Sequence, residues 1–287
     1  MRVADLVRLL EQRYPPAWAE DWDRVGLVLG EPEAPVGRVL LAVDCDPSTV
    51  AEAVDVGADL MLTHHPLLLR GVSSVAATTY KGRVVHWLIR AGIALFTAHT
   101  NADVANPGVS DALAARLGLL DLRPLVASGD GGRGHGRIGR LPAPVDLATF
   151  TRLAARALPS TAAGVRAAGR LAREVSLVAV LGGAGDAFLA DAARAGVDAY
   201  LTADLRHHPA SEILADNGPA LVDAAHWATE RPWLDDVAGY LREVAGVETI
   251  VSDIDTDPWT LHVASEENAS DRIAGEENAS EEKEPLS

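Results

Sequence analysis

Two segments of this chain share one order of predicted elements: a strand, a turn, a helix closed by a glycine, and a second strand. Residues 39–66 and 175–204 both follow this order, and GADLMLT at 57–63 aligns without a gap with GVDAYLT at 196–202. Strand–helix–strand units of this kind build parallel sheets covered by helices. We therefore predict an α/β fold made of two similar halves, in which His64 and His65 correspond to Ala203 and Asp204.

The composition between and after the two copies suggests how the 287 residues are divided. We predict a first α/β half at 1–126, a connector rich in glycine and arginine at 127–137, and a second α/β half at 138–263. Residues 264–287 repeat EENAS and contain eight acidic and two basic side chains. Because so polar and acidic a segment cannot bury enough apolar surface to offset its ordering entropy, we predict a disordered acidic tail.

Charge and cysteine content limit the partners and the compartment. The net charge of -16 argues against strong nucleic-acid binding, which depends on clustered lysine and arginine. No apolar run reaches the roughly 18 residues of a membrane-spanning helix, so we expect no membrane association. Cys45 is the single cysteine, and no secretory leader pattern precedes the first predicted helix. We therefore expect a cytoplasmic protein.

Histidines end two of the predicted strands in the first half. The run LMLTHHPLLL at 60–69 contains His64 and His65, and IALFTAHTNAD at 93–103 contains His99 and Asp103. A buried imidazole pair needs partners, which are either backbone hydrogen bonds at the strand end or a shared ligand. Ligand sites of open α/β sheets lie beyond the carboxyl ends of the strands, and both segments fall there.

A third strand end adds two more ligand-type residues. The segment LVDAAHWATERPWLDDVAGYL predicts a strand leading into His226 and then a helix, on which Glu230 lies one turn later. With His64, His65 and Asp103, this makes three imidazoles and two carboxylates, a set suited to Zn, Mn or Fe. Adjacent histidines on an extended backbone point to opposite sides, so the set favours two metals over one.

Glycines at 182, 183 and 185 follow another predicted strand. The spacing of a dinucleotide-binding fingerprint is absent and no lysine follows, so we interpret these glycines as a turn rather than a phosphate loop.

Seven motifs occur along residues 1 to about 263 in a family-specific order: DWDRVGLVLG, LTHHPLLL, AHTNAD, GRIGRLP, GGAGD, LTADLRHH and DAAHWATER. In this respect the chain resembles the GTP cyclohydrolase 1 type 2 homologs, also called Nif-three-like dinuclear metal centre proteins. The resemblance implies two similar α/β halves, a metal site at the strand carboxyl ends between them, and a homohexameric ring. It also implies that Glu230 bridges two divalent cations, one completed by His65 and Asp103 and the other by His64 and His226.

The chemistry implied by such a centre is metal-dependent hydrolysis of a small molecule such as a nucleotide. His99 and His208 are not needed as ligands in this scheme. They are therefore candidates for proton transfer or substrate contact, or for orienting the ligands. The alternative function is a ring-shaped metal-binding scaffold or regulator without turnover, because a fold and a metal pair do not by themselves define a substrate.

Overall fold

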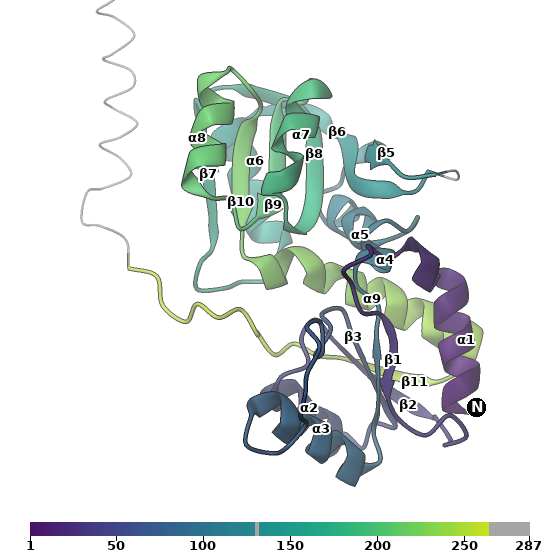
Figure 1. Ribbon diagram of the computed structural model, residues 1–287. Helices are drawn as coiled ribbons and strands as arrows, with labels where there is room; N and C mark the ends of the chain where they lie inside the picture. The colour runs from purple at the N-terminus through teal and green to yellow at the C-terminus, as the bar shows by residue number, and fades with distance from the viewer. Residues whose placement is uncertain (130–131, 264–287) are drawn as a thin grey trace, which may run out of the picture.

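The computed structural model describes residues 1–129 and 132–263 and contains two mixed β-sheets (Figure 1). The five-stranded sheet has the order β1-β4-β3-β2-β11, and the six-stranded sheet has the order β5-β6-β8-β9-β10-β7. The predicted α/β class is confirmed. The acidic tail predicted at 264–287 and two residues of the predicted connector lie outside the described residues. Within the described part, no helix has the length and apolar character needed to cross a membrane.

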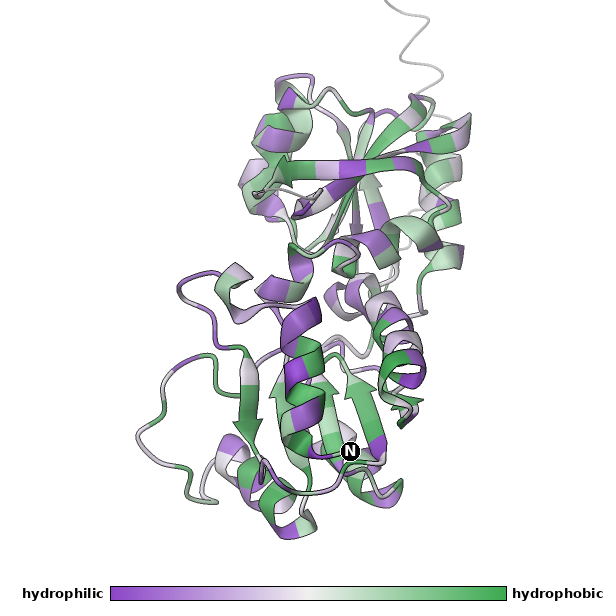
Figure 2. Ribbon diagram, turned by 90° about the vertical axis from the view of Figure 1, so that its right-hand side faces the viewer, coloured by the Kyte–Doolittle hydropathy of each residue, from purple (hydrophilic) through white to green (hydrophobic). Residues whose placement is uncertain are grey.

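The five-stranded sheet consists of short strands, and its three central strands are almost entirely buried. Its strands are β1 (Gly26–Leu29), β2 (Arg38–Ala42), β3 (Leu60–Thr63), β4 (Ala94–Thr97) and β11 (Glu248–Val251). The last four are parallel, while β1 runs antiparallel to β4. Figure 2 shows that most residues of these strands are hydrophobic, as expected for a sheet covered on both faces.

Alternate residues of this sheet pack against helices on opposite faces. The helices around it are α1 (Val3–Arg13), the 3-10 helix η1 (Pro16–Trp18), α2 (Pro47–Asp55) and α3 (Tyr80–Ala91). Val39 and Leu41 join the core that contains α1, whereas Leu40 joins the core that contains α2 and α3. Local signals set the helix ends: Asp46 accepts hydrogen bonds from the first-turn amides of α2, and Gly92 closes α3 at φ +70°.

The six-stranded sheet has longer strands and its own covering helices. Its strands are β5 (Leu120–Ala127), β6 (Gly134–Asp146), β7 (Val165–Ala168), β8 (Glu174–Ala184), β9 (Ala199–Ala203) and β10 (Ala220–Ala224). Its parallel pairs are β8 with β9 and β9 with β10, and its other pairs are antiparallel. The remaining helices are α4 (Thr100–Asp103), α5 (Val109–Arg116), α6 (Leu147–Ala157), η2 (Asp186–Phe188), α7 (Leu189–Arg194), α8 (His207–Ala215) and α9 (His226–Ala245).

The two segments that share a sequence pattern also share a hydrogen-bonding arrangement. Asp59 Oδ2 accepts hydrogen bonds from the amides of Gly37 and Arg38 as β2 begins. Asp198 Oδ2 accepts equivalent bonds from the amides of Ser176 and Leu177 in β8. In both places an aspartate before a strand binds the neighbouring parallel strand, which supports the predicted correspondence between the two halves.

The sheets do not divide the chain at the predicted connector. Residues 120–127 already form β5 of the six-stranded sheet, whereas β11 returns from the second half and pairs with β2. The end of the predicted connector is the start of β6, and Arg137 there is buried. Its guanidinium binds Asp111 and the carbonyl oxygens of Gly134 and Gly136. The two halves are therefore interleaved.

Helix α9 lies between the two sheets (Figure 1). Its side chains Trp233, Leu234 and Val237 are fully buried in a hydrophobic core that also includes residues of β2 and β8. Because the parallel strands of both sheets end near the first turn of α9, residues following those ends can meet there.

Candidate metal centre

Four histidines and one glutamate meet where strands of both sheets end. His64 and His65 follow β3, His99 follows β4, and His226 begins α9 directly after β10. Glu230 lies one helical turn beyond His226, so its carboxylate points to the same side of the helix. The ligand atoms of His64, His65 and His99 all lie within 4.8 Å of one another, as do those of His65, His226 and Glu230.

The Glu230 carboxylate lies at the centre of this cluster. Its Oε1 is 3.4 Å from His64 Nε2 and 3.0 Å from His226 Nε2. Its Oε2 is 3.1 Å from His65 Nε2. Asp103 Oδ1 lies 3.6 Å from His64 Nε2. The structure therefore brings together all five residues that the resemblance assigns as ligands, with the two oxygens of Glu230 facing different histidines.

Each of the four histidines is oriented by a hydrogen bond at Nδ1, on the side of the ring away from Nε2. The partners are the Ala98 carbonyl for His64 (2.9 Å), Asp44 for His65 (2.7 Å), Asp23 for His99 (2.9 Å) and Asp204 for His226 (2.6 Å). Since a carbonyl oxygen only accepts, His64 carries a proton on Nδ1, and Nε2 is the ring atom that faces the cluster. Metal-binding histidines are held in this way in proteins.

Two buried atoms of the cluster have no hydrogen-bond partner among the described residues. These atoms are His64 Nε2 and Glu230 Oε2. His64 Nε2 faces Oε1 of Glu230 at 3.4 Å without a hydrogen bond, so a positive charge between the two atoms, from a metal ion or a proton, would satisfy both. The donor set, with imidazole nitrogens and carboxylate oxygens, suits a divalent cation such as Zn, Mn or Fe. The residues present therefore fit a metal.

Protons compete with a cation for the same atoms. Burial opposes the charged form of His65, but Glu230 and Asp44 outweigh it and raise the pKa of His65 to about 10. Burial likewise opposes charge on His226, whose pKa Glu230 and Asp204 raise to about 11. Burial would raise the pKa of Glu230, yet the surrounding histidines hold it well below its usual value. The cluster thus keeps an anionic carboxylate surrounded by groups that release protons when a cation binds.

Asp103 differs from Glu230 in its electrostatic surroundings. Burial and the nearby Glu230 carboxylate raise the pKa of Asp103 to about 7, against the opposing effect of His99 and His65. A neighbouring cation would therefore stabilise the ionised form of Asp103, as it does for a metal ligand.

Sequence reasoning missed the three aspartates that hold histidine rings. Asp44 follows β2 and Asp204 follows β9, which are the same kind of strand end that identified His64 and His65. Asp23 lies in the loop after η1 and is buried, where it also accepts a hydrogen bond from the Thr100 amide at 3.0 Å. Asp44 and Asp204 could have been found by their strand-end position, whereas Asp23 lies within the DWDRVGLVLG motif, where no strand end links it to His99.

Gly183 has a role beyond the predicted turn. It lies at the end of β8 with φ +75°, and its amide donates to Thr229 Oγ1 at 2.9 Å. A methyl group there would overlap Glu230 Oε1 and lie 3.1 Å from His226 Nε2. The close approach of this strand to the Glu230 carboxylate therefore requires glycine.

The two histidines predicted to act beside the metals lie in different places. His99 is in the cluster, with its ring centre 5.1 Å from that of His64. His208 is exposed in α8 and packs against His207, and no contact of the described residues joins it to the cluster.

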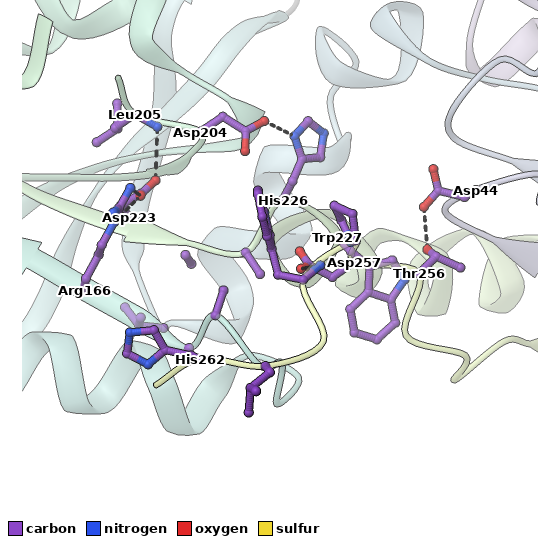
Figure 3. A pocket seen from close by; sticks show the side chains of 18 of the residues that line it. Asp44, Arg166, Asp204, Leu205, Asp223, His226, Trp227, Thr256, Asp257 and His262 are labelled. Carbon is purple, nitrogen blue, oxygen red and sulfur yellow. Dashed lines mark hydrogen bonds and ion pairs between the residues drawn. The ribbon is translucent and has the colours of Figure 1, made fainter. Parts of the chain in front are cut away.

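A cavity of about 690 Å³ opens onto the cluster (Figure 3). His65 and His226 line it together with Asp44 and Asp204, which hold their rings. Its other walls are residues 163–166, 205, 223–225, 227, 256–259 and 261–262. This volume lies within the range of about 300–1,000 Å³ that is typical of small-molecule sites.

Comparisons with known proteins show the family and the fold of this chain. A family model described as Duf34/NIF3 (NGG1p interacting factor 3) matches residues 1–258. A Streptomyces coelicolor relative named GTP cyclohydrolase 1 type 2 homolog is 52% identical over 92% of this chain and 95% of its own length. A Mycobacterium bovis relative of the same name is 40% identical over 91% and 97%. The crystal structure of a hypothetical protein from Staphylococcus aureus, 27% identical, superimposes with a TM-score of 0.84 over 91% of this chain and 99% of that one.

Proposed function

This chain belongs to the Duf34/NIF3 family, and on that premise we propose that it is a hydrolase that uses two divalent cations. Its substrate is a nucleotide or a related small molecule, which enters through the cavity beside His65 and His226. The name shared by its relatives, GTP cyclohydrolase 1 type 2 homolog, supports a nucleotide-related substrate.

The observation that carries this proposal is the position of the Glu230 carboxylate. Its Oε1 faces His64 and His226, and its Oε2 faces His65. A carboxylate whose two oxygens face different ligand groups is suited to bridge two cations, with His64 and His226 on one and His65 on the other. Asp103, 3.6 Å from His64 Nε2, completes the set, and its assignment to the cation of His65 is part of the proposal.

The chain's own residues then have separate tasks. When bound, the cations lower the pKa of water and stabilise negative charge on the leaving group. Asp44 and Asp204 keep the rings of His65 and His226 in place. Because Glu230 is buried, bulk water has little access to its carboxylate and does not compete with it for the cations. His99, whose Nδ1 is bound by Asp23, is placed to hold or transfer a proton at Nε2 next to the cluster.

Two further parts of the proposal concern the cell and the assembly. We propose the homohexameric ring that the family resemblance implies. The single cysteine, Cys45, is free and buried, which supports the proposal of a reducing, cytoplasmic compartment.

Metal analysis combined with a hydrolysis screen tests the proposed function. Purified full-length protein should contain two divalent cations per chain after reconstitution, and it should hydrolyse a nucleotide or a related cyclic amide only when metallated. His65→Ala should empty mainly one position and His64→Ala the other. One cation or none in the wild type would contradict the dinuclear site.

A pair of histidine variants separates proton transfer from metal binding. His99→Ala should retain both metals and lose rate, whereas the exposed His208→Ala serves as the matched control and should keep its rate. If the fully metallated wild type turns over no candidate substrate while Glu230→Gln disrupts the ring, the protein is the scaffold or regulator rather than the enzyme.

A further inference from the structure

An extended segment after β11, residues 252–263, forms one wall of the cavity, and we call it the C-terminal strap. In Figure 1 it is the yellow trace that leaves the five-stranded sheet. Ser252 Oγ donates to Glu52, and Thr256 Oγ1 donates to Asp44 Oδ2. Because Asp44 also holds His65, the strap is attached to the support of the candidate metal centre.

The strap places a large aromatic side chain on the cavity wall without covering it. Trp259 lines the cavity and remains 69% exposed. An indole that is not packed into the core provides a flat apolar face on which a planar ring can stack. Neighbouring Asp257 is only 9% exposed, and its Oδ1 accepts the Trp259 amide at 3.1 Å. The carboxylate and the indole are therefore held together.

The charged residues that line the cavity determine where the anionic and the neutral groups of a ligand can bind. Three of its carboxylates are paired with cationic or protonatable groups: Asp44 with His65, Asp204 with His226, and Asp223 with Arg166. Arg166 is the one lysine or arginine among the described lining residues, and it is engaged by Asp223. In the view of Figure 3 the Arg166–Asp223 and Thr256–Asp44 pairs lie on opposite sides, with His226 and Asp257 between them.

An anionic group of a ligand is therefore best placed at the metal centre, where the cations attract it. The remaining part of the ligand can meet Asp257, a carboxylate bound by a neutral amide and suited to accept N–H donors. A cavity of about 690 Å³ has room for both parts of a nucleotide.

We propose, on the premise of the proposed function, that Trp259 and Asp257 of the C-terminal strap form the base-binding subsite of the substrate. The ligand class is a phosphorylated amino-substituted nitrogen heterocycle, such as a guanine nucleotide. Its ring stacks on Trp259, its N–H donors bind the Asp257 carboxylate, and its phosphate faces the metal centre. These two residues thereby select the substrate without acting on the reacting bond.

Equilibrium binding to metal-loaded, full-length protein tests this subsite without requiring turnover. The probes are guanosine 5′-monophosphate and ribose 5-phosphate, which carries the phosphate without the base. Wild type should bind the nucleotide at least tenfold more tightly than the sugar phosphate. Trp259→Leu should remove most of that preference and leave sugar phosphate binding and metal content unchanged.

Two more variants make the result specific. Trp87→Leu, at another exposed tryptophan on α3, is the matched control and should bind both probes like wild type. Asp257→Asn keeps an acceptor for the Trp259 amide but loses the anionic charge, so it should weaken nucleotide binding alone.

The outcomes separate this inference from the proposed function. Base-dependent binding that Trp259→Leu abolishes, in a protein without turnover, would support the subsite and refute the hydrolase. Hydrolysis with equal affinity for both probes, or with no effect of Trp259→Leu, would refute the subsite and leave the hydrolase. A change of oligomer size in Trp259→Leu with unchanged binding would also overturn it, because the strap would then be a contact between copies.

Discussion

Gly183→Ala should disrupt the metal centre through a single added methyl group. The residue has φ +75°, where an alanine is strained by about 1–2 kcal/mol. The new methyl would also overlap Glu230 Oε1, well inside the 3.0 Å that Cβ atoms essentially never breach. Glu230 is buried on α9 and cannot swing into solvent. Its carboxylate must therefore shift by about 1 Å to reach ordinary van der Waals contact.

The backbone strain can be separated from the collision. Gly196, between α7 and β9, has φ +67°, and none of the described atoms lies within 4 Å of an added methyl there. Gly196→Ala therefore suffers the same strain without touching the site. Both variants should lower the free energy of unfolding of metal-free protein by about 1–2 kcal/mol, and Gly183→Ala should lower it further.

The effect on metal binding should differ between the two variants. Ligand distances in metal sites vary by only about 0.2 Å, so a displaced Glu230 should weaken binding by about 10–100-fold or more. Dialysis against metal buffers followed by elemental analysis measures this, and thermal unfolding of the metal-free proteins measures the strain. The reasoning is refuted if Gly183→Ala binds two cations with wild-type affinity, or if Gly196→Ala loses them equally.

Three other predictions follow from the same geometry. Glu230→Gln should weaken both cations together in competition titrations, because a neutral amide coordinates divalent cations poorly and does not offset their repulsion; loss of only one cation would show that Glu230 does not bridge. Asp44→Asn and Asp204→Asn should each lower metal affinity by about 10–100-fold, since His65 and His226 lose the carboxylates that orient them; unchanged affinity in both would contradict this role. Metal affinity should rise with pH up to about 11, because His65 and His226, with pKa values of about 10 and 11, are protonated below those values and must release protons. Calorimetry at pH 8 in buffers of different ionisation enthalpy should detect proton release, and its absence would contradict the protonated state.

Patterns among nearby residues determine many of the strands and helices of this protein. Apolar runs and the closing glycines Gly57 and Gly92 predict β2, α2, β3 and α3, because strand and helix periodicity depend on nearby residues. The rule that parallel strands end at one edge of a sheet then brought His64, His65 and His226 to one place. That rule is general enough to apply before any packing is known.

Tertiary structure decided what depends on residues far apart in the sequence. Strand β11 pairs with β2, which lies more than 200 residues earlier in the sequence. Arg137 can be buried because Asp111 and three carbonyl oxygens accept its hydrogen bonds. Asp23 and His99 are hydrogen-bonded although they lie 76 residues apart in the sequence, and no periodic pattern predicts that they pair. The close approach that requires glycine at 183 exists only once β8 packs beside α9. Local sequence determines which elements form and which side chains end them, whereas the distances between those side chains are set by how the two sheets pack around α9.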